Sequence, residues 1–246
     1  MKTRLFGFAL LMALSVSAIA QSNVIKITPL RLLTRQVNVG YERKITDKLS
    51  IGLNGGFYIP FSSSDSALFG QIDFSNGGDV AVQQSSFGGL TVTPELRVYF
   101  SQKGALRGFH LDPFLRYFNY NIGVDGVYQD PTEGNSDISS KFRFSGGGAG
   151  LSLGFQGIVA DIISIDWFIG GGAGVGGFRL DLSAEGPLED DIDSYVDDVR
   201  AELNAQLPGL GDRLVQESSV ADGYRFRIPA GVVPIFRTGL AVGIAF

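Results

Sequence analysis

The chain contains no cysteine and only one histidine, His110. Without cysteine no disulfide framework can form, which excludes a small stapled scaffold and all thiol chemistry. One histidine without cysteine also lacks the usual ligand set of zinc and other transition metals. We therefore expect no metal and no cofactor, and we assign no catalytic, cofactor-binding or metal-ligating residues.

Basic runs and long apolar runs are absent from residues 21–246. The formal net charge is −5, and it falls to −7 when Lys2 and Arg4, the only charged residues of segment 1–20, are set aside. An acidic chain without a Lys/Arg-rich run gives no reason to expect nucleic-acid binding. No segment offers the roughly eighteen consecutive apolar residues that a membrane-spanning helix needs.

The first 20 residues have the three parts of a secretory signal peptide. Lys2 and Arg4 supply positive charge, Phe6–Val16 is mostly apolar, and Ala18-Ile19-Ala20 forms a small-x-small cleavage site. We expect segment 1–20 to be removed on export. Gln21 follows the site where a lipoprotein would have cysteine, so no lipid anchor is expected. The mature part, 21–246, is about 226 residues, a length that suits a single all-β barrel.

The last stretch, Val233–Phe246, alternates from Phe236 onward, which is typical of a β-strand with two different faces. One face is mostly bulky and apolar, and the other is mostly small. The first carries Phe236, Thr238, Leu240, Val242, Ile244 and Phe246, and the second carries Arg237, Gly239, Ala241, Gly243 and Ala245. A strand of a soluble all-β domain would also fit. However, a final strand ending in phenylalanine resembles the closing strand of Gram-negative outer-membrane β-barrels. That resemblance implies recognition of Phe246 by the barrel-assembly machinery.

Seven earlier segments also read as strands, giving eight in all. They are 24–33 (interrupted by Pro29), 36–44, 49–59, 90–100, 108–121, 142–156 and 164–182. Their connections alternate in length. The short ones are near 45–48, 101–107 and 157–163, and the long polar ones cover 60–88, 122–140 and 183–222. Short turns at one rim and long loops at the other are typical of outer-membrane barrels. No convincing extra hairpins are visible within the loops.

The predicted fold is therefore an all-β, eight-stranded, antiparallel, transmembrane up-and-down β-barrel with one helical loop insert. Its apolar faces would contact lipid, where a charge at mid-depth costs about 2–4 kcal/mol. The clearest charges within strands fall on the opposite, inward faces: Glu95, Arg97, Asp112, Arg116, Asp166 and Arg237. Such charges could form a catalytic or transport pathway. We favour a packed polar interior, because eight strands leave just enough room for side chains and none for a general porin channel.

Two motifs suggest enzymatic chemistry at first sight. His110 could act as a base in a lipid-modifying barrel, but no serine stands at i+2, and its parity assigns it to the interior or the short-turn rim. The glycine run 170–177 superficially matches a dinucleotide-binding loop. No βαβ unit follows it, so a Gly-rich strand is the better interpretation.

The insert 183–222 is the one helical candidate. Apolar residues recur at helical spacing, and acidic residues precede them, where a helix dipole favours negative charge. The apolar positions are Ile192, Val196, Val199, Leu203 and Leu207. Residues 185–222 contain eleven acids against Arg200 and Arg213. A solvated face on a helix packed over the barrel mouth is the simpler interpretation. A divalent-cation site, or contact with the cation-bridged lipopolysaccharide surface, is the alternative.

With these pieces in order, the chain resembles an uncharacterised family of Gram-negative outer-membrane β-barrels, small barrels of the OmpA/OmpX type. The matching pieces are residues 39–43, 113–117, 153–156 and 164–168, the acidic helix and the terminal Phe246. The resemblance covers nearly all of 21–246. It implies the fold and an outer-membrane location, but no activity and no functional residues.

We therefore expect a monomeric, non-enzymatic outer-membrane protein with a structural or surface-interaction role through long extracellular loops. Its expected partners are outer-membrane lipid, lipopolysaccharide and, through Phe246, the assembly machinery. Two alternatives remain open. A membrane-embedded lipid-modifying enzyme would place His110 beside a serine at the lipid boundary. An exported barrel that binds an apolar ligand would have apolar side chains inside and charges outside.

Overall fold

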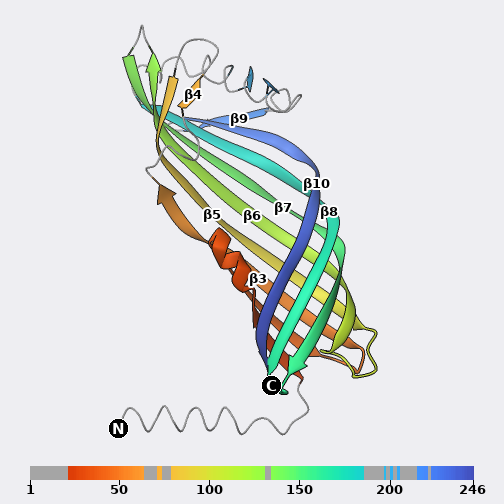
Figure 1. The fold of residues 1–246 in the computed structure, drawn as a ribbon. Coiled ribbons are helices and arrows are strands. Elements are labelled where there is room, and N and C mark those ends of the chain that lie inside the picture. The colour runs from red at the N-terminus through yellow and green to blue at the C-terminus, as the bar shows by residue number, and fades with distance from the viewer. Residues whose placement is uncertain are drawn as a thin grey trace, which may run out of the picture.

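The computed structural model describes residues 22–63, 71–73, 79–130, 134–185, 197, 200–201, 204–205, 215–220 and 223–246. Eight antiparallel strands follow one another around a ring (Figure 1). They are β1 (Asn23–Ile27), β2 (Gln36–Lys44), β3 (Leu49–Ser63), β5 (Asp79–Tyr99), β6 (Gly108–Asp130), β7 (Gly134–Val159), β8 (Ile163–Glu185) and β10 (Gly223–Ala245). Pairing of β1 with β10 closes the ring. The predicted all-β, eight-stranded antiparallel barrel is confirmed.

The three short turns lie where the sequence predicts them. They join β2 to β3, β5 to β6, and β7 to β8 at one end of the barrel, which we call the closed end. In the first turn the Thr46 hydroxyl accepts hydrogen bonds from the backbone N–H groups of Lys48 and Leu49. A hydrogen bond from Lys44, together with its charge, lowers the pKa of Asp47. Such turns end the strands without adding bulk to this rim.

The predicted long loops are largely wrong, because the strands run much further than their apolar alternation does. Segment 60–88 was expected to be a loop, yet β3 continues to Ser63 and β5 begins at Asp79. Segment 122–140 is mostly the β6–β7 hairpin, paired from Gly123↔Lys141 to Asp130↔Gly134. The closing strand begins at Gly223 rather than Val233. In these extensions the buried face carries small polar residues such as Ser136 and Ser140, so strand pairing persists without a sustained hydrophobic period.

Two short additional strands, which the sequence analysis did not anticipate, extend this open end. β4 (Gln71–Asp73) pairs with β5, and β9 (Val215–Val220) pairs with β10. Neither enters the ring. β9 lies in the segment expected to be the insert 183–222, and so does the end of β8 at Glu185.

The first predicted strand, 24–33, is shorter than expected. β1 ends at Ile27, and a 3-10 helix, η1 (Pro29–Thr34), follows it. Pro29 supplies the fixed φ of the first helical turn, and Arg35 ends the helix in the left-handed conformation (φ 56°). The connection from β1 to β2 therefore lies along the wall, well below the open rim (Figure 1).

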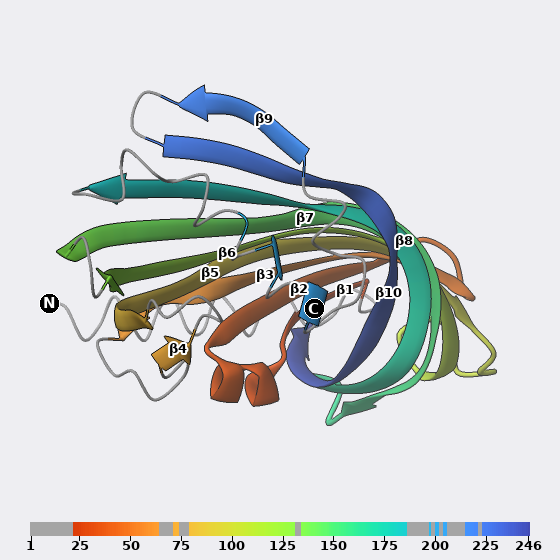
Figure 2. The ribbon, with the colours of Figure 1, turned by 90° about the horizontal axis from the view of Figure 1, so that it is seen from above.

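Closure of the ring is confined to the closed end. β1 covers only Val242–Ala245 of β10, and β9 covers only Gly223–Arg227. Residues 228–241 of β10 pair with β8 on one side and with no described strand on the other. We call this free edge and the facing η1 the seam. In Figure 1 the far-wall strands are visible between η1 and β10, and Figure 2 shows the wall as an open curve from above.

Side-chain direction follows the predicted parity. Leu115 and Leu153, for example, are 61% and 59% exposed on the outside, whereas Arg97 and His110 are each 1% exposed inside. The outward row Ile163, Ile165, Trp167, Ile169 and Val175 of β8 is also exposed. No helix within the described residues has the length and apolar character needed to cross a membrane.

Two predicted features lie largely outside the described residues. The signal peptide, 1–20, is one of them. The other is the amphipathic helix, whose apolar positions Ile192, Val196, Val199, Leu203 and Leu207 are likewise not described. Residues 197, 200, 201, 204 and 205 of that segment are helical.

Candidate functional site in the barrel interior

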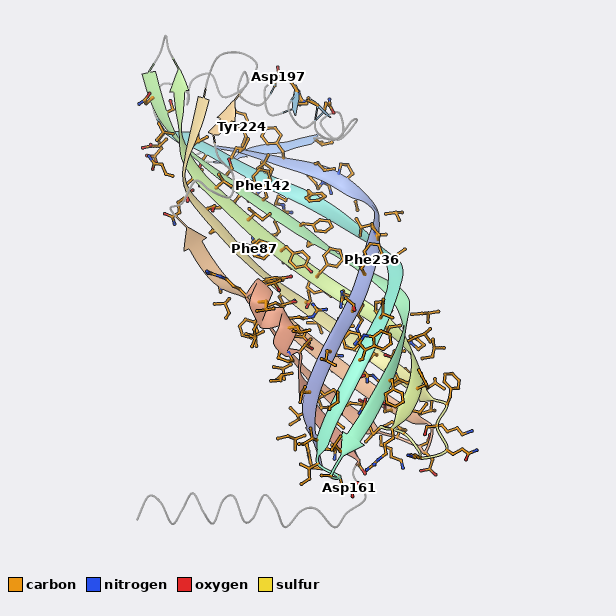
Figure 3. The ribbon with its side chains drawn as sticks, viewed as in Figure 1. Phe87, Phe142, Asp161, Asp197, Tyr224 and Phe236 are labelled. Atoms are coloured by element: carbon orange, nitrogen blue, oxygen red, sulfur yellow. The ribbon has the colours of Figure 1, made fainter. Side chains whose placement is uncertain are left out.

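The inward face of β6 displays the layers of the interior in order. From the closed end it carries His110 and Asp112, then Phe114 and Arg116, and then two aromatic residues, Phe118 and Tyr120. The first two are buried and charged, Arg116 is half-buried, and Phe118 is 4% exposed. The interior is thus polar near the short turns and aromatic toward the open end. Figure 3 marks the two ends of this axis with Asp161 in a short turn and Tyr224 near the open end.

Eight ionisable side chains, which we call the charged cluster, fill the polar layer. They are Lys26, Glu42, Glu95, Arg97, His110, Asp112, Asp166 and Arg237, and none is more than 6% exposed. They come from β1, β2, β5, β6, β8 and β10. Burial of so many charges is sustainable only if they are paired and hydrogen-bonded.

Lys26 and Arg97 are the two cations at the centre of the charged cluster. Lys26 Nζ donates to Glu42 at 2.5 Å, to Gln156 at 2.7 Å and to Asp166 at 2.8 Å, which uses its three donors. Arg97 donates through Nη1 to Asp166 at 2.6 Å and through Nε to Glu95 at 2.8 Å. The two cations therefore share Asp166, and the network joins five strands across the lumen, β1, β2, β5, β7 and β8.

His110 lies between two carboxylates. Its Nδ1 is 2.5 Å from Asp112 Oδ1, and its Nε2 is 3.2 Å from Asp166 Oδ1. When Asp112 and Asp166 are both ionised, their oxygens only accept hydrogen bonds, so both ring nitrogens donate and the ring is an imidazolium. With that proton the charged cluster contains four cations and four anions, and it is electrically neutral. The ring has no free nitrogen to act as a base.

Arg237 forms the upper edge of the charged cluster. Its guanidinium pairs with Glu95, and Nη1 donates to Ser152 at 3.3 Å. It also lies over the ring of Phe168, 4.5 Å from the centroid, and 5.4 Å from that of Phe114. These cation–π contacts stabilise a charge that is removed from water.

Two further arginines, Arg31 of η1 and Arg116 of β6, lie above the charged cluster without any ion pair. Arg31 donates to Gln36 at 2.6 Å and to the backbone oxygen of Thr238 at 3.2 Å. Arg116 donates to Thr93 at 3.2 Å and to the backbone oxygen of Phe236 at 3.1 Å. Both arginines therefore occupy carbonyl groups on the free edge of β10, and each keeps its full positive charge.

The aromatic layer is a continuous series of ring contacts, which we call the aromatic ladder. Tyr58 contacts Phe87 and Tyr120 at 4.8 and 5.8 Å between centroids. Phe118 contacts Tyr120 at 5.9 Å and Phe144 at 5.0 Å, and Phe144 stacks on Phe178 at 4.3 Å. The ladder thus spans the inner wall from β3 to β8. Several of its members are only partly buried although they point inward.

Glycines on neighbouring strands make room for the large inward rings. A Cβ on Gly150 would lie 2.5 Å from the Phe114 ring, and one on Gly146 would lie 2.8 Å from that of Phe118. A Cβ on Gly154 would likewise meet His110 at 2.4 Å. The glycines of β7 therefore leave room for the large inward side chains of β6.

The structure brings five of the six predicted interior charges together. Glu95, Arg97, Asp112, Asp166 and Arg237 join the charged cluster, whereas Arg116 lies apart from it. Lys26 was missed, although it alternates with outward Ile25 and Ile27, and so was the partnership of Tyr99 with Glu42, at 2.6 Å. Among the described residues, no group of three or more His, Asp or Glu side chains is arranged to hold a metal ion.

Comparison with known proteins adds a family but no function. No curated protein matches. Among solved structures, the crystal structure of CarO from Acinetobacter baumannii is similar over 94% of this chain and 98% of that one, at 10% identity and a TM-score of 0.37. An overlap this loose adds nothing to what the strand pairing shows. A family model described as a protein of unknown function, DUF3575, matches residues 6–177. Since that match covers well over half of its length, the chain belongs to the DUF3575 family.

Proposed function

We propose that this protein is embedded in the outer membrane as a non-enzymatic barrel with a structural or surface-interaction role. The observation that carries the proposal is the placement of side chains, with apolar residues outside and the charged cluster inside. This is the inverse of the arrangement in a soluble protein. On β8 the outward apolar row from Ile163 to Val175 covers about 40 Å of strand at roughly 3.3 Å per residue. At a strand tilt near 45° this corresponds to roughly 28 Å of membrane, about the height of a lipid-facing belt.

The same inversion argues against a soluble barrel with an apolar interior and a charged exterior, at least for the closed half. The interior location of His110 argues against a lipid-facing catalytic base, because both ring nitrogens are already bound to carboxylates. A filled charged layer across the lumen also disfavours an open aqueous channel. The long hairpins at the open end remain as the part available for contact with other molecules.

Contact with lipopolysaccharide is the partner we propose for the outer wall. Arg143, Arg179 and Arg227 are directly opposite one another on β7, β8 and β10. Like charges in such a row repel, unless an anion lies among them. The row lies two outward positions beyond Val175, at the upper border of the apolar belt. A groove of about 330 Å³ runs between the arginines, with Asn119, Ser145 and Gly177 also in its lining. Lipid phosphate groups would neutralise Arg143 and Arg179.

The test of membrane placement combines two measurements on the full chain. Membrane-extracted protein should migrate differently on gels before and after boiling, because closed barrels resist detergent unfolding. On intact cells, added protease should cleave within 183–222 and leave the closed-end turns 45–48 and 101–107 intact. Cleavage at the short turns, or release of the protein by high salt without detergent, would show that the proposal is wrong.

A further inference from the structure

The proposed surface role does not involve the two unpaired arginines or the aromatic ladder. Arg31 and Arg116 are half-buried, and neither forms an ion pair with any described residue. Their four hydrogen bonds all go to neutral groups: Gln36, Thr93 and two backbone carbonyls. Removing a guanidinium from bulk water without an anionic partner is costly. An anionic group bound to these two arginines would therefore lower the free-energy cost of burying them.

The spacing of the two arginines suits a single anionic group. They bind the carbonyl oxygens of Thr238 and Phe236, which are two residues apart on one strand edge. Two residues of β-strand cover about 7 Å, so guanidinium groups anchored at this spacing are near enough for one phosphate or carboxylate to reach both. Charge-assisted hydrogen bonds from two arginines to one oxyanion are among the strongest in proteins. Below this point Arg237 is already neutralised by Glu95.

The inner wall above the arginines suits contact with an apolar chain. On β6 the inward residues next after Arg116 are Phe118 and Tyr120, which belong to the aromatic ladder. Ile235 packs with Phe114 and Phe118, and Val233 and Phe144 extend the same apolar surface. An apolar wall continuous with two unneutralised cations is the pattern of a site for an amphiphile.

The seam supplies a route from the side. Along residues 228–241, β10 has no described strand partner away from β8. Both borders of the seam expose large apolar side chains: Leu33 and Val232 are each 83% exposed, and Phe236 is 79% exposed. Figure 3 shows Phe236 on β10 pointing away from the lumen. A free strand edge within a membrane is costly, because lipid offers no hydrogen bonds. The two arginine side chains satisfy part of that edge, and they lie where an entering head group would pass.

We propose that the upper lumen binds a single-chain amphiphile with a phosphate or carboxylate head group, which enters through the seam. Arg31 and Arg116 hold the head group, and the aromatic ladder contacts the acyl chain. The route through the seam rests on the proposed membrane placement. The binding site does not, because its residues are adjacent in the folded chain in any solvent.

The experiment uses the full chain in a neutral detergent, with dodecyl phosphate as the probe and native mass spectrometry as the readout. The wild-type protein should retain dodecyl phosphate and dodecanoate in preference to dodecyl maltoside, which has the same chain without charge. Butyl phosphate, a head group with little chain, should not be retained. Comparing the retention of dodecyl phosphate with that of dodecanoate distinguishes a phosphate from a carboxylate head group. Absence of any preference for the charged probes would overturn the proposal, even without a variant.

The double variant Arg31→Gln, Arg116→Gln should bind dodecyl phosphate about 10-fold or more weakly, as expected for loss of hydrogen bonds to a charged group. Arg43→Gln, which removes an exposed arginine at the closed end, serves as the matched control and should bind as the wild type does. Heat-modifiable migration reports whether each variant is folded. Equal affinity of the double variant and the control would exclude the two arginines as the head-group site.

Entry through the seam is tested separately, in vesicles. Since the chain has no cysteine, Leu32→Cys and Thr238→Cys can be joined uniquely by a flexible bismaleimide. Joining them should slow uptake of dodecyl phosphate from the bilayer at least several-fold, while binding in detergent at equilibrium persists. Unchanged uptake would exclude the lateral route. Failure of the protein to insert into membranes would instead contradict the proposed function and leave the detergent result valid.

Discussion

At the scale of single residues, the interior is governed by the cost of buried charge. Arg97 is 1% exposed and lies within ion-pair distance of four carboxylates, those of Glu42, Glu95, Asp112 and Asp166. Buried pairs of this kind often add little net stability compared with apolar packing. Their removal one at a time is much more costly, because the remaining partners are left without compensation.

We therefore expect Arg97→Met to lower the free energy of unfolding by about 3–5 kcal/mol, as removal of one partner of a buried ion pair does. Urea titration of the refolded barrel, followed by heat-modifiable migration, measures this change. Lys44→Met is the matched control. It removes a cation from an exposed pair with Asp47, and the midpoint should hardly move. Equal midpoints for the two variants would contradict the assignment of Arg97 as the central cation.

At the scale of strands, β7 and β8 depend on glycine. Glycines face each other across this pair, as in Gly150↔Gly172 and Gly148↔Gly174. A Cβ on Gly172 would lie 2.0 Å from the backbone oxygen of Ala149, a distance that real atoms do not reach. The obstacle is backbone and cannot rotate away. Glycine is therefore required here by the close approach of two strands.

Gly172→Ala should consequently separate β7 from β8 locally and cost about 1–3 kcal/mol, as overpacking does. Gly55→Ala is the control on β3, because an added Cβ there has no neighbour within 4 Å. Its effect should stay within about 0.5 kcal/mol. Refolding yield and the urea midpoint of the two variants are the measurements. A neutral Gly172→Ala would show that the strands are further apart than described.

At the scale of the whole molecule, three zones are stacked along the barrel. The neutral charged cluster closes the lumen near the short turns, the aromatic ladder lines the upper lumen, and long paired hairpins extend beyond the apolar belt. The outer wall has a matching division, with the apolar belt below and the arginine row of β7, β8 and β10 above it. In the proposed membrane placement, this alignment of inner and outer zones favours one depth of the barrel.

The outer arginine row predicts retention of lipopolysaccharide by the purified protein. Arg143→Gln combined with Arg179→Gln should reduce co-purified lipopolysaccharide about 10-fold, because two charge-assisted contacts are lost. The control pair Arg43→Gln and Lys103→Gln removes the same charge from exposed positions at the closed end. The amount of lipopolysaccharide retained by this control should equal that of the wild type. Equal losses in both pairs would attribute the effect to net charge alone.

Much of the closed half of the barrel could be predicted from the sequence. The period of two on β5, β6 and β10 fixed which side chains share a face, because successive side chains of a strand point to opposite sides. Arg97 and Asp112 were therefore assigned to the interior correctly, and His110 was assigned to the interior or the short-turn rim. The three short turns were also located correctly, since each interrupts an apolar alternation on both sides.

The open half could not be predicted in the same way. Residues 60–88 and 122–140 lack a sustained apolar period, because their buried positions include small polar residues such as Ser85, Ser136 and Ser140. The 3-10 helix at Pro29–Thr34 was hidden for a different reason. Its leucines are as apolar as the residues of β1, so the sequence predicted a single strand that continues to Leu33.

The sequence by itself determined the strand order, the two faces of each strand and the inward position of most charges, since these depend on local alternation alone. Only the tertiary structure decided which charges meet. Lys26 contacts Asp166 across 140 positions of sequence, and Arg31 reaches the backbone of Thr238 across 207. Such contacts depend on the register and the closure of the whole ring. The seam likewise appears only because β1 and β2 are shorter than the strand they face.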